Sequence, residues 1–317
     1  MLLFYLFWSM MKKVLVTGSN GLLGQKLTDL YLKQTDRVQL IATARGANRH
    51  PVKEGYTYAE MDISNPDSVN EVINKYKPDT IINTAAMTNV DACETDKEGC
   101  TKLNVDAVEY LVNATNKVGA HLIHLSTDFI FDGEDGPYDE EAKANPLSFY
   151  GDSKLKGEEI VINKANNWSI ARTVLVYGIV ADMSRSNIVL WVRDSLSQGK
   201  DINVVDDQFR TPTLAEDLAQ GCWLIEEKEA TGIYNISGKD FYSIYDMVSV
   251  IADHYKLDKK YIHRIKSDTL NQAAKRPPKT GFILNKAYTD LGYTPHSFIE
   301  GIDIVEKQAK EATHAKQ

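Results

Sequence analysis

The sequence predicts an α/β fold in which helices cover both faces of a doubly wound parallel sheet, with a smaller C-terminal lobe woven into it. Three observations support this prediction. Short apolar runs alternate with amphipathic segments of helical length, glycines recur at the turn after the first run, and no Pro/Gly linker divides the chain. The chain has 317 residues, of which 43% are hydrophobic, so it can bury a full core.

The expected strands are apolar runs that end in small or polar residues, which is typical of buried parallel strands. Between them lie amphipathic segments whose lengths suit crossover helices. The runs are KVLVTG (13–18), VQLIATA (38–44), TIINTAA (80–86), HLIHLST (121–127) and SIARTVLVYG (169–178), and the helical segments include 22–34, 66–77 and 102–119.

Charge and cysteine content argue against a nucleic-acid-binding protein and against a secreted, disulfide-rich one. The net charge of -8 and the pI of about 5.5 argue against nucleic acid as a partner, because phosphate contacts need a basic face. Three cysteines without metal-ligand spacing fit a reducing cytoplasm better than a secreted disulfide framework. The apolar opening, residues 1–10, is far short of the roughly 20 residues that span a bilayer. We expect a cytoplasmic protein without a membrane partner, and we treat 1–10 as a disordered or misassigned extension.

The first strand runs directly into TGSNGLLG, which places Gly18, Gly21 and Gly24 three residues apart. At a strand-to-helix turn, the first glycine permits the tight turn, the second lets a pyrophosphate approach the backbone, and the third lets the helix pack on the strand. The helix N-terminus then faces the phosphates. A glycine triplet alone is a weak signal, but this position favours a Rossmann-type dinucleotide site over a plain glycine-rich turn. The site would include the neighbouring Asn20, Leu22 and Leu23.

The next two strand ends bear on the choice of cofactor. Arg45 follows the second strand, where an acid usually meets the ribose of NAD, and arginine suits the 2′-phosphate of NADP. A solvated basic loop has the same composition, so NADP(H) is preferred and NAD(H) stays open. Asp62 and Ile63 follow the third strand, where a short acid can face the adenine, although Asp62 can also serve as a helix cap.

The fourth apolar run ends in Thr127 and Asp128, so a hydroxyl and a carboxylate would emerge at the carboxyl edge of the sheet, where α/β proteins bind ligands. One loop later, FYGDSK places Tyr150 and Lys154 four residues apart, on one face of a helix that we expect over 145–164. A tyrosine beside a cation can act as a proton donor, although a solvated helix face shows the same spacing.

With these motifs, the chain resembles the extended short-chain dehydrogenase/reductase superfamily, and within it the dTDP-4-dehydrorhamnose reductase family, from residue 12 to about 305. The resemblance implies NADPH-dependent reduction of the 4-keto group of a nucleotide-linked 6-deoxy sugar, most simply dTDP-4-dehydro-L-rhamnose to dTDP-L-rhamnose. The stretches that carry it are TGSNGLLG, INTAAMTNVDACE, LSTDFIFDG, NPLSFYGDSKLKGE, RTVLVYG, DQFRTPTLAEDLA and KRPPKTGFILNKA.

The resemblance also implies a role for each residue of the site. Tyr150 would donate a proton to the sugar C4 oxygen as the nicotinamide delivers hydride to C4. Lys154 would hold the nicotinamide ribose and lower the pKa of the tyrosine. Thr127 would hydrogen-bond the reacting oxygen, and Asp128 would orient substrate hydroxyls. The other residues carried over are Ala85, Ala86 and Met87 at the cofactor, Thr88 and Val90 at the sugar, and Arg210 and Arg276 near the nucleotide diphosphate.

We expect the NAD(P)-binding Rossmann domain over residues 11–176 and a mainly substrate-binding lobe over 177–317. The alternation of apolar runs and helical segments becomes less regular after Gly178. We also expect that part of 207–238 returns to the first domain. A homodimer is the default expectation for a reductase of this kind.

Departures from the family pattern leave alternatives open. Leu175 stands where the reductases usually carry a tryptophan, and Gly281 and Phe282 interrupt the usual RP-x-x-S-x-L motif. Lys26 stands where some relatives carry an acid linked to metal binding, so we expect no metal. One alternative is a sugar-nucleotide epimerase or dehydratase that retains its NAD. Another is a non-catalytic, cofactor-binding regulatory subunit similar to the β subunit of methionine adenosyltransferase.

Overall fold

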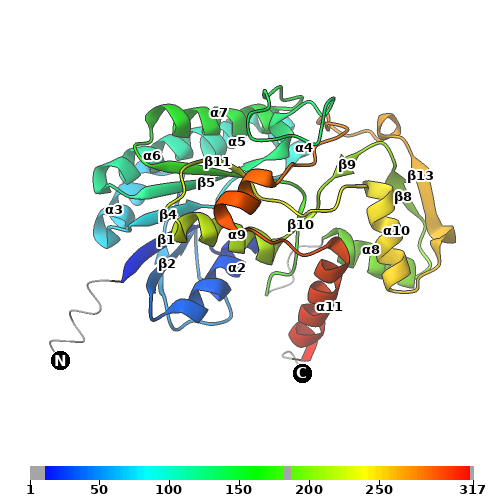
Figure 1. Cartoon of the computed structure of the whole chain (residues 1–317), viewed down its shortest axis with the longest axis horizontal. Coiled ribbons are helices and arrows are strands. Elements are labelled where there is room, and N and C mark those ends of the chain that lie inside the picture. Colours follow the sequence, from blue (N-terminus) through cyan, green and yellow to red (C-terminus); the bar gives the residue numbers. More distant parts are fainter. Residues whose placement is uncertain (1–10, 182–186, 315–317) are drawn as a thin grey trace.

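The structure, a computed structural model, describes residues 11–181 and 187–314. The extension expected at 1–10 lies outside the described residues. Seven strands form one parallel sheet in the order β11-β6-β5-β4-β1-β2-β3, which confirms the doubly wound α/β fold (Figure 1). The strands are β1 (Lys12–Thr17), β2 (Val38–Ala44), β3 (Thr57–Glu60), β4 (Thr80–Asn83), β5 (His121–Thr127), β6 (Trp168–Thr173) and β11 (Gly232–Asn235).

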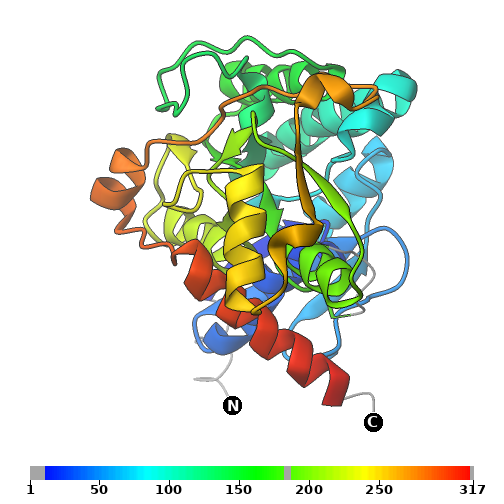
Figure 2. The same cartoon turned by 90° about the vertical axis from the view of Figure 1, so that its right-hand side faces the viewer.

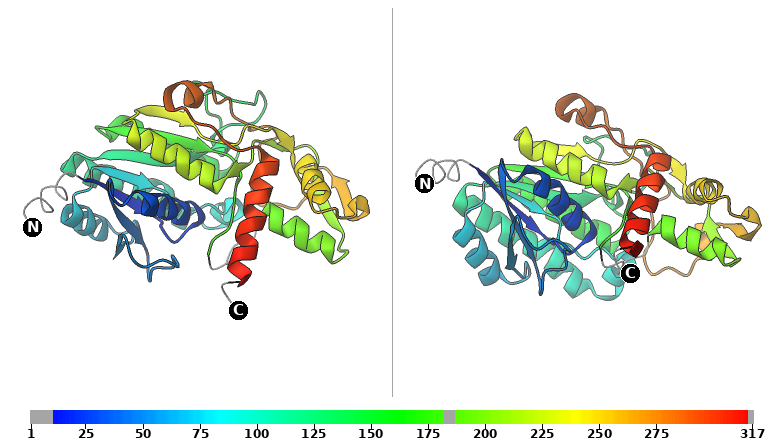
Figure 3. Two further views of the ribbon diagram at one scale, coloured as in Figure 1. Left: turned by 60° about the horizontal axis from the view of Figure 1, so that its bottom comes forward. Right: turned by 90° about the horizontal axis from the view of Figure 1, so that it is seen from below.

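Helices bury both faces of this sheet, as Figure 3 shows from below. Leu27 of α2 and Leu218 of α9 belong to a core on one face, and Ile73 of α3, Leu111 of α6 and Val161 of α7 belong to a core on the other. The central strands β4 and β5 are therefore buried along their whole length rather than on alternate residues, whereas the edge strand β3 is partly exposed. The helices are α2 (Leu22–Tyr31), α9 (Ala215–Glu227), α3 (Pro66–Tyr76), α6 (Ala107–Val118) and α7 (Phe149–Lys164).

The last strand expected from the sequence, over 169–178, is broken in two. β6 ends at Thr173, and Leu175 takes the left-handed backbone conformation, with φ of 36°. The chain then pairs with a different partner, because β7 (Val176–Tyr177) runs parallel to β10 (Thr213–Leu214) outside the main sheet. This bend brings the chain from the sheet to the second lobe.

The second lobe has its own apolar core, to which α8, α10 and α11 contribute, and Figure 2 shows these helices at the front. A parallel pair, β8 with β13, packs on α10, and in an antiparallel pair, β9 with β12, the second strand lies directly before α10 and contacts it. No helix among the described residues combines the length and the apolarity that a bilayer crossing needs. The elements are α8 (Ile188–Ser197), α10 (Ile244–His254), α11 (Phe298–His314), β8 (Ile202–Val205), β13 (Ile262–Ile265), β9 (Phe209–Arg210) and β12 (Tyr242–Ser243).

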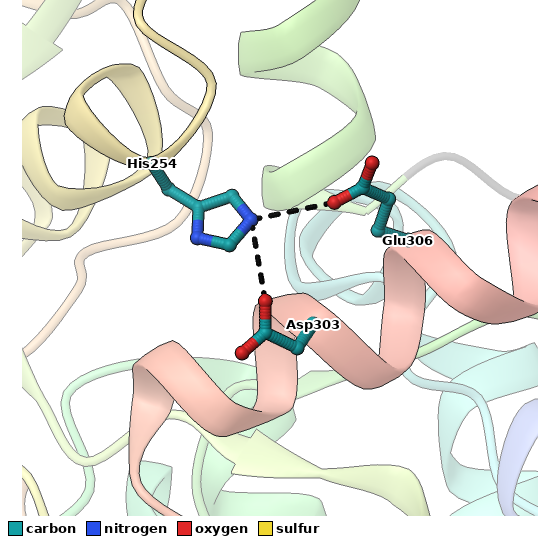
Figure 4. A group of neighbouring side chains, drawn as sticks. All are labelled: His254, Asp303 and Glu306. Atoms are coloured by element: carbon teal, nitrogen blue, oxygen red, sulfur yellow. Dashed lines mark hydrogen bonds and ion pairs between the residues drawn. The ribbon is translucent and has the colours of Figure 1, made fainter.

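A cluster of three polar side chains joins α10 to α11 in this lobe (Figure 4). Nε2 of His254 lies 3.4 Å from a carboxylate oxygen of Glu306 and 3.6 Å from one of Asp303. The three side chains have the ligand types of a metal site, but Glu306 is also paired with Lys310 at 2.6 Å. Because the lysine already neutralises one carboxylate, we interpret the group as a polar contact between two helices.

Candidate active site

A cleft of about 630 Å³ opens at the carboxyl edge of the sheet. Its walls come from the turn after β1, the ends of β2 to β6, and the first turns of α7. Every site residue predicted from the sequence lines this cleft except Met87, Arg210 and Arg276. Lining residues that the sequence reasoning did not single out include Thr84, Leu103, Phe129, Thr173, Val176 and Val180.

The glycine turn has the geometry that close approach of a phosphate requires. Gly18 has φ of 64°, a left-handed conformation that favours glycine, and a Cβ there would lie 2.9 Å from the Thr84 hydroxyl. A Cβ on Gly24 would overlap the backbone of Gly18, so the third glycine lets α2 pack against the turn. The buried Ser19 hydroxyl in the same turn has no hydrogen-bond partner in the structure. These features fit a turn that holds a pyrophosphate at a helix N-terminus.

The loop after β2 is fastened to the glycine turn by Asn20. Its side-chain oxygen accepts a hydrogen bond from the Arg49 backbone at 2.8 Å, and its amide nitrogen donates to Ala47 at 2.9 Å. Arg45 and Arg49 both line the cleft beside the turn, and both are exposed. The cleft therefore carries two cations where a dinucleotide's adenosine ribose would lie.

Asp62 closes a local turn rather than capping the next helix. It accepts hydrogen bonds from the backbone and hydroxyl of Ser64, whereas Asn65 is the N-cap of α3. Burial raises the pKa of the Asp62 carboxyl, but the Ser64 hydrogen bonds and the charge of Arg45 outweigh it and lower the pKa. Asp62 is therefore an ionised acid in the cleft.

Helix α7 begins at Phe149, four residues later than expected, because the Ser148 hydroxyl caps it by accepting from the backbone of Gly151 at 3.2 Å. A Cβ on Gly151 would overlap the carbonyl oxygen of Phe129. This glycine therefore lets the first turn of α7 touch the segment that follows β5, and the contact sets the position of Tyr150.

The Tyr150 side chain is 8% exposed and packs edge-on against Phe129, with ring centroids 5.7 Å apart. Burial raises the pKa of Tyr150 well above its usual value, and the hydrogen bond with Thr127 only partly opposes this. The direction is opposite to the lowering that we expected from Lys154. In the structure, the Lys154 amine donates to the carbonyl oxygen of Leu125 at 2.6 Å, so its hydrogen bond is to the strand.

Lys154 is 4% exposed, an unusual place for an amine. Burial lowers its pKa to about 8, while the carboxylate of Glu158 acts in the opposite direction. The second polar neighbour of the amine is the ring of His124, with Nε2 3.5 Å from Nζ. The pKa of Lys154 therefore lies near neutral pH, so both its charged and its neutral form are accessible there.

Asp128 and Arg210 form a buried pair beside the catalytic candidates. Nε of Arg210 lies 3.6 Å from a carboxylate oxygen of Asp128, and the Thr280 hydroxyl donates to the same oxygen. Arg210 also donates to the carbonyl oxygens of Pro277 and Pro278, at 2.8 and 3.3 Å. Arg210 is 3% exposed, so it fastens the 277–280 segment to the end of β5 rather than reaching into the cleft.

Arg276 is held in a similar way at the surface. Its two terminal nitrogens donate to the two carboxylate oxygens of Asp91 at 3.2 and 2.6 Å. Asp91 lies in α4 (Val90–Thr95), next to the cleft-lining Val90. The sequence reasoning missed Asp91 and Thr280, since their partners lie 185 and 152 residues away along the chain.

Met87, the third predicted residue outside the lining, is bound through its backbone. Asn104 accepts from the Met87 N–H at 2.9 Å and donates to the Met87 carbonyl at 3.0 Å. The same amide nitrogen lies 3.0 Å from the Ser153 hydroxyl in α7. Asn104 thus joins the loop after β4 to α7, the helix that carries Tyr150 and Lys154. No local sequence pattern predicted this link.

Comparison with known proteins agrees with this geometry. The family described as the RmlD substrate binding domain matches residues 11–310. The dTDP-4-dehydrorhamnose reductase of Aggregatibacter actinomycetemcomitans is 30% identical over 313 residues, covering 95% of this chain and all of that protein. The methionine adenosyltransferase 2 subunit beta of Xenopus tropicalis is 30% identical over 271 residues, covering 84% of this chain and 78% of that protein.

Among solved structures, the dTDP-4-dehydrorhamnose reductase of Bacillus anthracis in complex with NADP superposes with a TM-score of 0.80 at 26% identity. The match covers 94% of this chain and all of that one. By sequence and by structure, the chain belongs to the dTDP-4-dehydrorhamnose reductase family of NAD(P)H-dependent oxidoreductases, within the extended short-chain dehydrogenase/reductase superfamily.

Proposed function

We propose that the protein reduces the 4-keto group of a nucleotide-linked 6-deoxy sugar with NADPH, and that its substrate is dTDP-4-dehydro-L-rhamnose. The observation that carries the proposal is the meeting of Thr127, Tyr150 and Lys154 in the same cleft as the glycine turn. A phenol, a hydroxyl and an amine at one end of a dinucleotide cleft suit a carbonyl reduction, which needs a proton donor next to a bound hydride donor.

The cofactor would lie along the wall built from the glycine turn and the loop after β2. Backbone N–H groups of the turn can bind its phosphates. Arg45 and Arg49 can pair with the 2′-phosphate of NADP, which favours NADP(H) and leaves NAD(H) as a weaker cofactor. The complex of the Bacillus anthracis relative with NADP supports this choice.

The protein's own groups would supply the proton. The raised pKa keeps the Tyr150 phenol protonated over the physiological range, so it can donate to the C4 oxygen of the sugar. The Thr127 hydroxyl donates to Asp128 at 3.0 Å, and it would turn to donate to that oxygen when the sugar binds. Lys154 would hold the nicotinamide ribose, and bound NADPH would supply the hydride. Asp128, Thr88 and Val90 are the neighbouring groups that we assign to the sugar.

The test uses purified protein, NADPH and dTDP-4-dehydro-L-rhamnose generated in the same vessel. Absorbance at the nicotinamide band should fall, and dTDP-L-rhamnose should appear in the chromatogram in an equal amount. NADPH that binds without being oxidised would refute the reductase reaction with this sugar. A panel of other nucleotide-linked 4-keto sugars would then test the wider substrate class.

A regulatory subunit is the second candidate, because the methionine adenosyltransferase β subunit matches at the same identity as the reductase. Leu175 supports it, because this cleft residue replaces the tryptophan expected of the reductases. Specific binding to a methionine adenosyltransferase catalytic subunit, together with no turnover of any keto sugar, would favour this role over the enzyme.

A further inference from the structure

A chain of buried polar side chains runs behind the cleft from the first strand to Lys154. Thr17, Asn83 and His124 are each at most 2% exposed, and none of the three lines the cleft. Thr17 Oγ1 lies 2.7 Å from Asn83 Oδ1, and Asn83 Nδ2 lies 3.0 Å from His124 Nδ1. The other ring nitrogen, Nε2, faces Lys154 Nζ at 3.5 Å. The chain thus links the adjacent strands β1, β4 and β5 to helix α7.

The direction of these hydrogen bonds follows from the donors and acceptors around the Thr17 hydroxyl. The N–H of Ala85 donates to Thr17 Oγ1 at 3.2 Å, which occupies one acceptor position of the hydroxyl. Among the described residues, the one hydrogen bond that the hydroxyl donates is to Asn83 Oδ1, so the carbonyl end of the amide faces it. The amide nitrogen then faces His124, where Nδ1 has to be the acceptor. A neutral imidazole that accepts at Nδ1 carries its proton on Nε2.

We propose that Thr17 and Asn83 hold His124 in the neutral tautomer protonated at Nε2, and that this N–H disfavours a full positive charge on Lys154. An N–H dipole directed at an ammonium group is repulsive, whereas a neutral amine can accept a hydrogen bond from it. His124 cannot turn into an acceptor unless Asn83 turns over, which would leave the Thr17 proton without its acceptor. Thr17, Asn83 and His124 are therefore positioning residues that act through Lys154.

The other groups around the lysine do not duplicate this effect. Burial lowers the pKa of Lys154, while the Glu158 carboxylate and the Cys100 thiol raise it. Glu158 is bound to Arg172 through both of its oxygens, at 3.0 and 2.7 Å, which offsets its negative charge. Burial and the charge of Lys154 keep the pKa of His124 well below its usual value, so the ring is neutral. His124 therefore affects the pKa of Lys154 through the orientation of its neutral ring dipole, not through a charge.

Two substitutions at Thr17 separate this role from packing. Thr17→Val keeps the shape of the side chain and removes the hydroxyl, so the Asn83 carbonyl is free to turn toward His124. The ring proton then moves to Nδ1, and Nε2 accepts from the ammonium. Thr17→Ser keeps the hydroxyl and is the matched control. In proton–nitrogen spectra of the imidazole rings, we expect His124 protonated at Nε2 in wild type and Thr17→Ser, and at Nδ1 in Thr17→Val.

The pH dependence of NADPH binding gives a second readout. The ammonium form attracts the anionic cofactor, so affinity should weaken as pH rises through the pKa of Lys154, which is about 8. Because Thr17→Val stabilises the ammonium, this weakening should move to higher pH by about one unit, and Thr17→Ser should behave like wild type. If Thr17→Val does not fold, His124→Phe also removes the N–H and should give the same upward move.

We call this chain of side chains, Thr17–Asn83–His124, the relay. Its role rests on the proposed function and deepens it, since Lys154 is the residue that we assign to the nicotinamide ribose. Both readouts work without the sugar, so failure of wild-type turnover would count against the proposed substrate and not against the relay. Protonation of wild-type His124 at Nδ1 would overturn the relay. So would a Thr17→Val protein, or in its place a His124→Phe protein, whose binding profile matches that of wild type.

Discussion

The two walls of the cleft are built in different ways. The cofactor wall, residues 18–24 with the loop after β2, is held by its own backbone and by Asn20, which reaches partners 27 and 29 residues away. The substrate wall, on the side proposed for the substrate, has Asp128 at the cleft and Arg210 with residues 276–280 behind it, and it is held by side-chain hydrogen bonds that span 67 to 185 residues. Local sequence therefore specifies the first wall, and only the assembled fold specifies the second.

Tyr150 lies where the two walls meet, so its loss should have the largest effect on turnover. We expect Tyr150→Phe to lower kcat by about 10²–10⁴-fold, because the proton donor is removed while the ring stays in place. NADPH affinity, measured by fluorescence titration, should change less than twofold. Tyr245→Phe in α10, outside the cleft, is the control and should keep wild-type turnover. Near-normal turnover of Tyr150→Phe would contradict the proton-donor role.

Removing one charged side chain from the substrate wall should lower the stability of the protein more than removing one from the cofactor wall. Arg210→Gln would leave the Asp128 carboxylate, 2% exposed, without its cation, which typically costs about 3–5 kcal/mol of unfolding free energy. Urea denaturation measures this loss. Arg193→Gln, which breaks a pair with the exposed Asp194, should change stability by only about 0.5 kcal/mol or less. Equal stability of the two variants would show that the Arg210 pair does not hold the wall.

The sequence predicted most of the cofactor wall because its signals are local. Gly18 and Gly24 were expected to allow a tight turn and close packing, and the structure shows the steric reason for each. Arg210 and Arg276 were expected near the substrate diphosphate, but both guanidinium groups are paired with carboxylates. Nothing in a single sequence shows that Asp91 and Asp128 are those carboxylates, because such partners depend on tertiary contacts.

Two other features of the fold were beyond local patterns. The run 169–178 looked like one strand, but Leu175 bends the chain so that β7 joins a different sheet. The polar link through His124 also lies within a fully buried strand, where a histidine looks like any other core residue. In both cases, the deciding contact comes from another element of the chain.

The cofactor wall can be tested through its preference for the 2′-phosphate. Arg45→Ala combined with Arg49→Ala should weaken NADPH binding by about tenfold, or about 1.4 kcal/mol. The reason is that the 2′-phosphate loses the charge-assisted hydrogen bonds that the two guanidinium groups would donate. NADH binding should stay within twofold of wild type. Lys53→Ala, farther along the same loop, controls for a general loss of positive charge. An equal loss of affinity for both cofactors would contradict recognition of the 2′-phosphate.

The smallest effect is expected at the edge of the substrate wall, where Arg276 is paired with Asp91 and would also pair with the diphosphate of the nucleotide sugar. Asp91→Asn should cost only a few tenths of a kcal/mol of stability, because the pair is partly exposed. Since the freed guanidinium no longer has to leave a carboxylate, KM for the nucleotide sugar should fall by about two- to fivefold with kcat unchanged. Arg276→Gln should raise KM. A fall in KM with Asp91→Asn that persists when Arg276 is also replaced would mean that the carboxylate repels the diphosphate directly, and that Arg276 only holds the wall.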